Sequence, residues 1–165
     1  MARPIADQVV VITGASSGIG REAALRFAAQ GAHVVLVARN EEALREVERR
    51  VQRLGGQALA VPADVADWPQ VQRVARQAVE RFGRIDSWVN NAAVSVYGTF
   101  EQIPVEEFRR VVDVVLMGHV HGAKAAQAYL KQSRGTLIGI GSALSQLPVP
   151  LQSPPSQWIF WWIAP

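Results

Sequence analysis

The feature that most constrains this chain is a glycine-rich turn that joins an apolar segment to a helical pattern. The apolar segment covers residues 9–12, the turn covers residues 13–20 with the sequence TGASSGIG, and the helical pattern covers residues 21–30. A glycine turn between a strand and a helix is typical of a dinucleotide-binding site. The beginning of the chain therefore predicts a strand, a phosphate-binding turn and a helix.

Each glycine of this turn has its own physical task at such a site. Gly14 permits the tight turn, Gly18 lets the backbone approach a pyrophosphate, and Gly20 lets the helix pack close to the strand. The free N–H groups of the helix's first turn then face the phosphates, and the helix dipole adds to the attraction. The binding residues predicted in this turn are Gly14, Ser16, Ser17, Gly18, Ile19 and Gly20.

Composition and length indicate one globular domain of ordinary size. The chain has 165 residues, of which 49% are hydrophobic and 19% are charged. It has no cysteine, so we expect neither disulfides nor thiolate chemistry nor a metal site. The formal charge of +3 comes mostly from arginines that alternate with glutamates on helix faces, as in Glu41–Arg45 and Glu46–Arg50. Because no basic stripe is interleaved with aromatic residues, we expect no nucleic-acid partner.

The sequence shows neither a signal peptide nor a membrane span. Residues 1–8 are short, mixed and polar, and no apolar run approaches the roughly 20 residues that a spanning helix needs. We therefore expect a cytoplasmic protein without a membrane partner.

Strand-like and helix-like segments alternate along the chain. After residues 9–12, strands are expected at residues 33–37, 58–61, 85–89 and 136–140. Helices are expected at residues 18–30, after an Asn40 cap, after an Asp67 cap, and from Pro104 to about Lys131. This alternation predicts an α/β fold with a doubly wound parallel sheet of about five strands and helices on both faces, as in Rossmann-like domains.

Further motifs follow along the chain in the order that is typical of the short-chain dehydrogenase/reductase family. The chain resembles this family from about Asp7 to Ser153. The turn is similar to the family's TGxxxGIG motif, and residues 90–93 are similar to its NNAG motif, with Ala93 in the glycine place. The resemblance implies hydride transfer between NAD(P)(H) and a carbonyl or alcohol. It implies cofactor contacts from Asp64, Val65, Asn90, Asn91 and Ala92, and a catalytic role for Ser142 after the fifth strand.

Some of these residues also have a structural interpretation. Asp64 and Val65 match the pair that holds the adenine ring, but Asp64 alone is equally typical of a turn after a strand. Asn90 and Asn91 are able to bond the neighbouring backbone at the strand end without touching a ligand.

The end of the second strand favours NADP(H) over NAD(H). NAD-specific sites place a carboxylate there for the ribose 2′-hydroxyl, whereas this chain has Ala38 followed by Arg39. A guanidinium without a neighbouring anion favours a 2′-phosphate. The alternative is that Arg39 is a solvated loop arginine.

The sequence departs from the family where the reaction needs a proton. The family has a Tyr-x-x-x-Lys pair beginning thirteen residues after the serine, in which the lysine lowers the pKa of the tyrosine. Here Pro155 and Ile159 occupy these two places, and neither side chain can transfer a proton. Val115 stands where the family usually has an asparagine that supports a proton-relay water.

The composition changes abruptly after Ser153. Residues 154–165 carry no charge and hold three of the five tryptophans, so we expect an incomplete binding domain at residues 1–153 and an atypical apolar tail at residues 154–165. A shifted reading frame with an early stop accounts for this pattern, and a splice product or a short variant is the alternative. The family's last strands are then expected to be missing.

Three functional hypotheses follow from these patterns. The first is an oxidoreductase of the short-chain dehydrogenase/reductase lineage, expected to be inactive in this form, whose intact parent acts on a carbonyl or alcohol with NADP(H). The second is a non-catalytic NADP(H)-binding module that dimerises through residues 104–131, as the family often does. The third is an unstable product without a function of its own.

Overall fold

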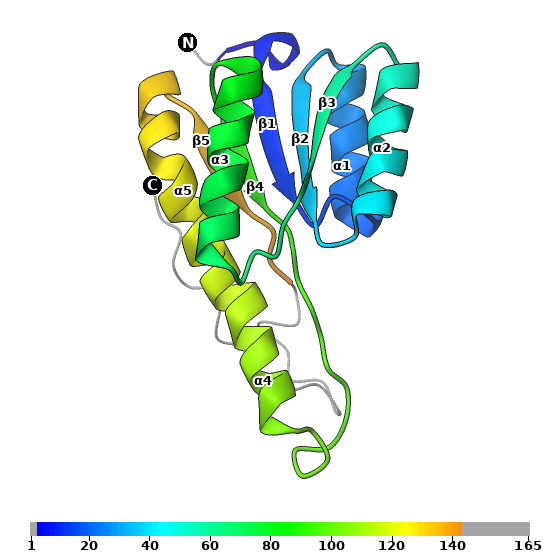
Figure 1. The fold of residues 1–165 in the computed structure, drawn as a ribbon, viewed down its shortest axis with the longest axis vertical. Coiled ribbons are helices and arrows are strands. Elements are labelled where there is room, and N and C mark those ends of the chain that lie inside the picture. Colours follow the sequence, from blue (N-terminus) through cyan, green and yellow to red (C-terminus); the bar gives the residue numbers. More distant parts are fainter. Residues whose placement is uncertain (1–2, 143–165) are drawn as a thin grey trace.

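A parallel sheet of five strands forms the centre of the computed structural model, which describes residues 3–142. The strand order is β3-β2-β1-β4-β5 (Figure 1). The predicted doubly wound α/β fold is confirmed, and each strand begins and ends within two residues of its predicted limits. The strands are β1 (Val9–Thr13), β2 (His33–Ala38), β3 (Gln57–Pro62), β4 (Ser87–Asn90) and β5 (Thr136–Gly139).

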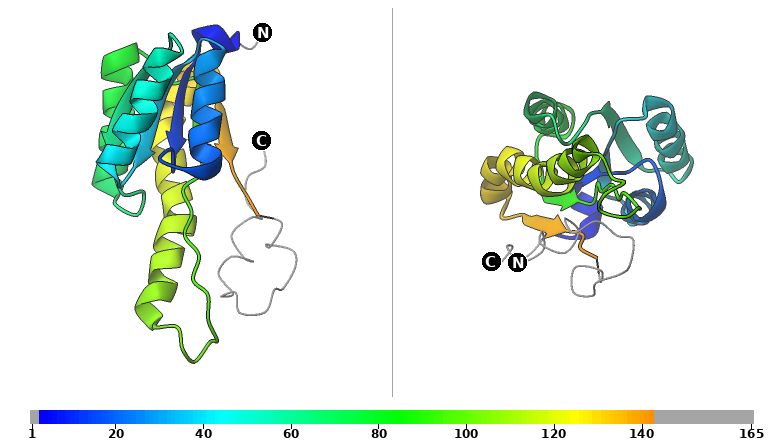
Figure 2. Two further views of the ribbon diagram at one scale, coloured as in Figure 1. Left: turned by 90° about the vertical axis from the view of Figure 1, so that its right-hand side faces the viewer. Right: turned by 90° about the horizontal axis from the view of Figure 1, so that it is seen from below.

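Successive side chains of the strands point to opposite faces of the sheet and pack into two apolar layers, one on each face. Val9 and Val11 of β1 pack with α3 (Trp68–Phe82) and α5 (Gly118–Ser133). Val10 and Ile12 pack with the helices on the opposite face, which are α1 (Gly18–Ala29) and α2 (Glu41–Arg53). Figure 2 shows the resulting three layers. The central strand is buried on both faces, which explains its continuous run of apolar residues.

The helices begin where the sequence places capping residues. The Asn40 side chain accepts a hydrogen bond from the Ala43 N–H at 3.0 Å, and the Asp67 side chain accepts one from the Gln70 N–H at 3.0 Å. Such caps stabilise a helix by roughly 1 kcal/mol each. The two ion pairs predicted along α2 also form. Local sequence signals therefore fix the limits of α2 and α3.

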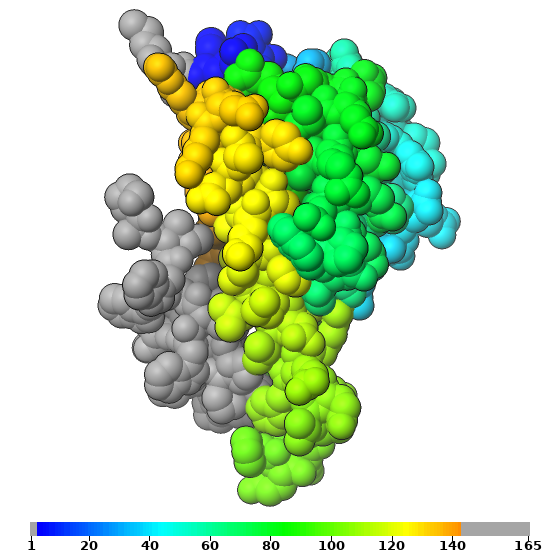
Figure 3. Space-filling model, turned by 60° about the vertical axis from the view of Figure 1, so that its left-hand side comes forward, coloured from blue at the N-terminus to red at the C-terminus, as the bar shows by residue number. Residues whose placement is uncertain are grey.

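The helix predicted from Pro104 to Lys131 forms, but it contains a π-helical segment. It consists of α4 (Val105–Val111), the π segment (Val112–Met117) and α5, and it remains helical across both junctions. We call residues 95–117 the arm, because they extend beyond the carboxyl ends of the strands (Figure 1). In Figure 3 the yellow-green atoms at the bottom belong to this arm. Within residues 3–142, no helix has the length and apolarity needed to cross a membrane.

Helix α5 lies directly against β4 because a glycine faces the strand. A Cβ atom added at Gly122 would overlap Oδ1 of Asn90 and would lie 2.5 Å from Nε1 of Trp88. The Trp88 indole donates to Asn90 Oδ1 at 2.9 Å, and the Asn90 amide donates to the His119 carbonyl at 3.1 Å. The close approach of α5 therefore allows a buried polar network to join the helix to the sheet.

We expect Gly122→Ala to destabilise the chain, although alanine has the higher helix propensity. The added methyl group must displace the Trp88–Asn90 pair, and overpacking of this kind costs about 1–3 kcal/mol. Urea unfolding followed by circular dichroism measures the change in the free energy of unfolding. Gln127→Ala, on the exposed side of α5, is the control and should change it by less than about 0.5 kcal/mol. An equal or higher stability for Gly122→Ala would contradict this packing.

Candidate functional site

A cleft of about 850 Å³ opens at the carboxyl ends of the strands, where the chain's winding direction reverses between β1 and β4. Ligands of open α/β sheets bind at such reversal points. The cleft brings together ten of the predicted site residues, from four separate segments of the chain. They are Gly14, Ser16, Ser17, Gly18, Ile19, Arg39, Asp64, Val65, Asn91 and Ala92.

The glycine turn has the geometry that its sequence predicts. Gly14 and Gly18 adopt left-handed backbone conformations, with φ of +68° and +52°. A Cβ atom on Gly20 would overlap the Gly14 carbonyl oxygen, whereas a Cβ atom on Gly18 would meet nothing within 4 Å. Gly20 thus allows helix α1 to pack against the turn, and Gly18 leaves its backbone open to the cleft.

A threonine hydroxyl holds the turn against the end of β4. Oγ1 of Thr13 accepts hydrogen bonds from the N–H groups of Asn91 at 2.9 Å and Ala92 at 3.0 Å, and it donates to the Val89 carbonyl at 3.3 Å. The Asn91 side-chain amide donates back to the Thr13 carbonyl at 2.9 Å. These bonds fix the floor of the cleft, and sequence reasoning did not single out Thr13 for this role.

The first turn of α1 presents backbone donors to the cleft. Ser17 is its N-cap residue, and the Ser17 side chain forms no capping hydrogen bond. The first N–H groups of a helix lack partners within the helix, and the helix dipole attracts an anion to them. Ile19 is 68% exposed beside them, which is unusual for a large apolar side chain. This end of the cleft fits a phosphate group next to an apolar surface.

Charged side chains line the other end of the cleft. Arg39 is exposed at the end of β2, and no residue within 3–142 forms an ion pair with it. Burial raises the pKa of the Asp64 carboxyl, but the Ala66 N–H, the Arg110 guanidinium and the charge of Arg39 outweigh burial, so the pKa lies below its usual value. The cleft therefore combines an ionised carboxylate with two guanidinium groups.

Arg110 is a cleft residue that sequence reasoning missed. Its Nη2 atom donates to Oδ2 of Asp64 at 2.8 Å, and both side chains line the cleft. Arg110 lies on α4, 46 residues beyond Asp64. It follows Arg109 in a run of charged residues on a helix, so no local pattern distinguishes it from a solvated arginine.

Three predicted site residues do not line the cleft. Gly20 is buried against the turn, and Asn90 is 2% exposed, with its amide and its oxygen both bonded to protein groups. Ser142 is exposed three residues beyond β5. Val115, which stands where the resemblance places the family's asparagine, is buried in the π segment. Residues 143–165, which include Pro155, Ile159 and the predicted apolar tail, lie outside the described part of the chain.

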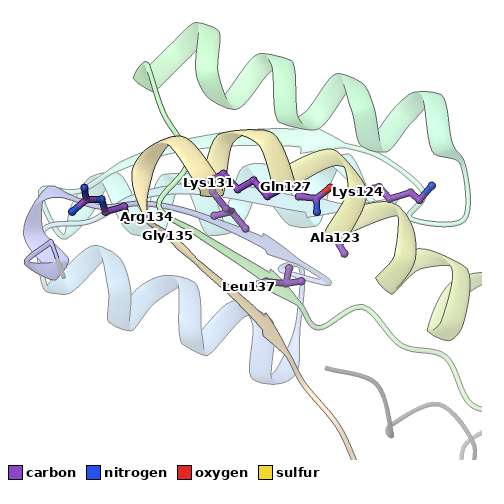
Figure 4. A pocket seen from close by; sticks show the side chains of 8 residues that line it. Ala123, Lys124, Gln127, Lys131, Arg134, Gly135 and Leu137 are labelled. Carbon is purple, nitrogen blue, oxygen red and sulfur yellow. The ribbon is translucent and has the colours of Figure 1, made fainter. Parts of the chain in front are cut away.

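A second hollow of about 650 Å³ lies between α5 and β5, away from the glycine turn (Figure 4). Figure 4 shows Lys124, Gln127 and Lys131 extending from α5, with Leu137 on β5 and Arg134 in the turn between them. None of the predicted site residues lines this hollow. Within residues 3–142, no group of histidine, aspartate and glutamate side chains is arranged to hold a metal ion.

One known protein family matches most of this chain. The family model described as short chain dehydrogenase matches residues 8–155. The chain belongs to the short-chain dehydrogenase family. The match includes the glycine turn, the Asp64 loop and Asn90–Asn91.

Relatives of this chain are oxidoreductases from bacteria and plants. The uncharacterized oxidoreductase YxnA of Bacillus subtilis is 43% identical over 153 residues, which are 92% of this chain and 43% of that protein. The 11-beta-hydroxysteroid dehydrogenase A of Sesamum indicum is 39% identical over 151 residues, which are 90% of this chain and 43% of that protein. The chain therefore spans less than half the length of these curated relatives.

A solved structure shows the same architecture with a nucleotide bound. The alcohol dehydrogenase of the archaeon Thermococcus sibiricus, complexed with 5-hydroxy-NADP, is 31% identical to this chain with a TM-score of 0.83. The alignment covers 87% of this chain and 62% of that one. A short-chain type dehydrogenase/reductase from Mycobacterium marinum aligns with a TM-score of 0.83 at 33% identity, over 91% of this chain and 62% of that one.

Proposed function

We propose that this chain binds NADP(H) in the cleft, as the nucleotide-binding part of a short-chain dehydrogenase. The observation that carries the proposal is the open backbone at Gly18, where the free N–H groups of α1 meet the cleft. A pyrophosphate needs backbone donors that a side chain does not shield. Ser16 and Ser17 add hydroxyl groups at the same place, and Asp64 and Val65, which resemble the family's adenine-binding pair, line the same cleft.

The choice of NADP(H) over NAD(H) rests on Arg39. This guanidinium lies at the end of β2 between Ala38 and Asn40, so no carboxylate is present there to accept the ribose 2′-hydroxyl. A 2′-phosphate offers a guanidinium charge-assisted hydrogen bonds. The NADP analogue bound by the Thermococcus sibiricus enzyme, a structural neighbour, supports the same choice.

We expect Arg39→Gln to weaken NADPH binding by about tenfold or more and to leave NADH binding within about twofold, because hydrogen bonds between charged groups contribute about 1.5–3 kcal/mol. Fluorescence titration of the two reduced dinucleotides measures both dissociation constants. Arg53→Gln, an exposed change of the same charge at the other end of α2, is the control. Equal losses for NADPH and NADH would contradict the proposed 2′-phosphate contact.

We further propose that the given sequence binds the dinucleotide without turning over substrate. When bound, the dinucleotide supplies hydride, and the family's reaction also needs a group that gives or takes a proton. Pro155 and Ile159 occupy the places of that pair, and Val115 is a buried apolar residue in the relay position. Ser142 is retained and would orient a carbonyl, but the sequence has no tyrosine or lysine at the two places from which the family moves the proton.

NADPH oxidation should accordingly remain at the buffer rate when the purified chain is mixed with small aldehydes and ketones. Absorbance at the nicotinamide band follows the reaction, with an intact relative as positive control. Oxidation that rises in proportion to the chain, and that the substitution Ser142→Ala abolishes, would contradict an inactive site.

We also propose that the chain self-associates through residues 104–131, because apolar side chains of this helix are exposed on the arm. Val105 is 74% exposed, and Val112, Leu116 and Met117 are partly exposed along the same helix. Apolar side chains that follow one helix are typical of an interface. Light scattering after size exclusion should give the mass of a dimer, and Leu116→Glu with Val112→Glu should give the mass of a monomer. A monomer mass for the unchanged chain would contradict the proposal.

A further inference from the structure

We propose that Arg110 is the positioning residue that makes the cleft specific for a purine base carrying an exocyclic amine. The inference rests on the proposed function, because it concerns the base of the same dinucleotide. It adds a contribution from the arm to a site that is otherwise built from the ends of the strands. The contact that carries it is the ion pair between Arg110 and Asp64.

Both oxygens of the Asp64 carboxylate are held by protein donors. Oδ1 accepts from the Ala66 N–H at 3.0 Å, and Oδ2 accepts from Nη2 of Arg110 at 2.8 Å. A carboxylate offers about four acceptor positions, so each oxygen keeps a further one. Two anchors on different oxygens fix the plane of the group, and the remaining acceptor positions then have a fixed direction.

The anchored carboxylate remains accessible to a ligand. The Asp64 side chain is 26% exposed and the Arg110 side chain is 35% exposed, and both line the cleft. Arg110 also favours the ionised form of Asp64, which only accepts hydrogen bonds. A fixed, ionised acceptor attracts the amine of adenine and repels the carbonyl oxygen that hypoxanthine carries at the same ring position.

Arg110 makes this contact from outside the sheet. It lies in the last turn of α4, whereas Asp64 follows β3, so the ion pair joins the arm to the loop that ends in α3. The adjacent Arg109 is exposed and does not line the cleft. The two neighbouring arginines therefore form a matched pair of the same charge, of which only one reaches the site.

The test compares NADP⁺ with its hypoxanthine analogue, in which a carbonyl oxygen replaces the amine. Isothermal titration calorimetry gives both dissociation constants for the unchanged chain, Arg110→Gln and Arg109→Gln. We expect the unchanged chain to prefer NADP⁺ by about tenfold or more, and Arg110→Gln to reduce this preference to less than about threefold. Arg109→Gln should keep the full preference. Asp64→Asn should lose it to the same extent as Arg110→Gln.

The preference ratio separates positioning from a merely structural role. Equal weakening of both dinucleotides by Arg110→Gln would overturn the proposal, because a distorted cleft affects both ligands alike. An unchanged chain that binds both equally would overturn it while leaving dinucleotide binding intact, whereas binding of neither would overturn the proposed function as well. If Arg110→Gln does not fold, Arg110→Lys replaces it and should reduce the preference, because an ammonium lacks the planar fork.

Discussion

The close contact between the glycine turn and the end of β4 is the constraint on which the cleft depends. Thr13 joins the two strands through its hydroxyl, and Gly20 brings α1 against the carbonyl of Gly14. Because Thr13 and Gly20 are buried and both contacts are short, they fix where the first turn of α1 points. A looser turn would move the free N–H groups away from the reversal point. The other cleft residues would then lie too far from the proposed phosphate site to bind the same dinucleotide.

The two adjacent asparagines at the end of β4 bind to different neighbouring elements. Asn90 does not line the cleft, and it joins β4 to α5 through hydrogen bonds with the Trp88 indole and the His119 carbonyl. Asn91 faces the cleft and ties β4 to the turn after β1. The structural interpretation of both residues therefore has direct support, while a contact of Asn91 with a ligand stays a prediction.

The sequence predicted the features that local patterns determine. The glycine turn, the Asn40 and Asp67 caps and the alternating strands depend on neighbours within a few residues, so their positions follow from the sequence. The role of Thr13 and the Asp64–Arg110 pair could not be predicted in this way, because their partners lie 78 and 46 residues away. The π segment could not be predicted either, because it contains no glycine or proline that would indicate a change in the helix. The residues that replace the family's proton-transfer pair lie outside the described part of the chain.

The most direct test of the account is the location of the dinucleotide on the folded chain. Amide chemical shifts recorded during titration with NADP⁺ report each backbone N–H separately, so they identify which elements the ligand touches. We expect the largest changes at Gly18, Ile19 and Ala92, with changes at Asp64 and little change at the α5–β5 hollow. Changes confined to that hollow, or none at saturating concentrations of the ligand, would contradict it.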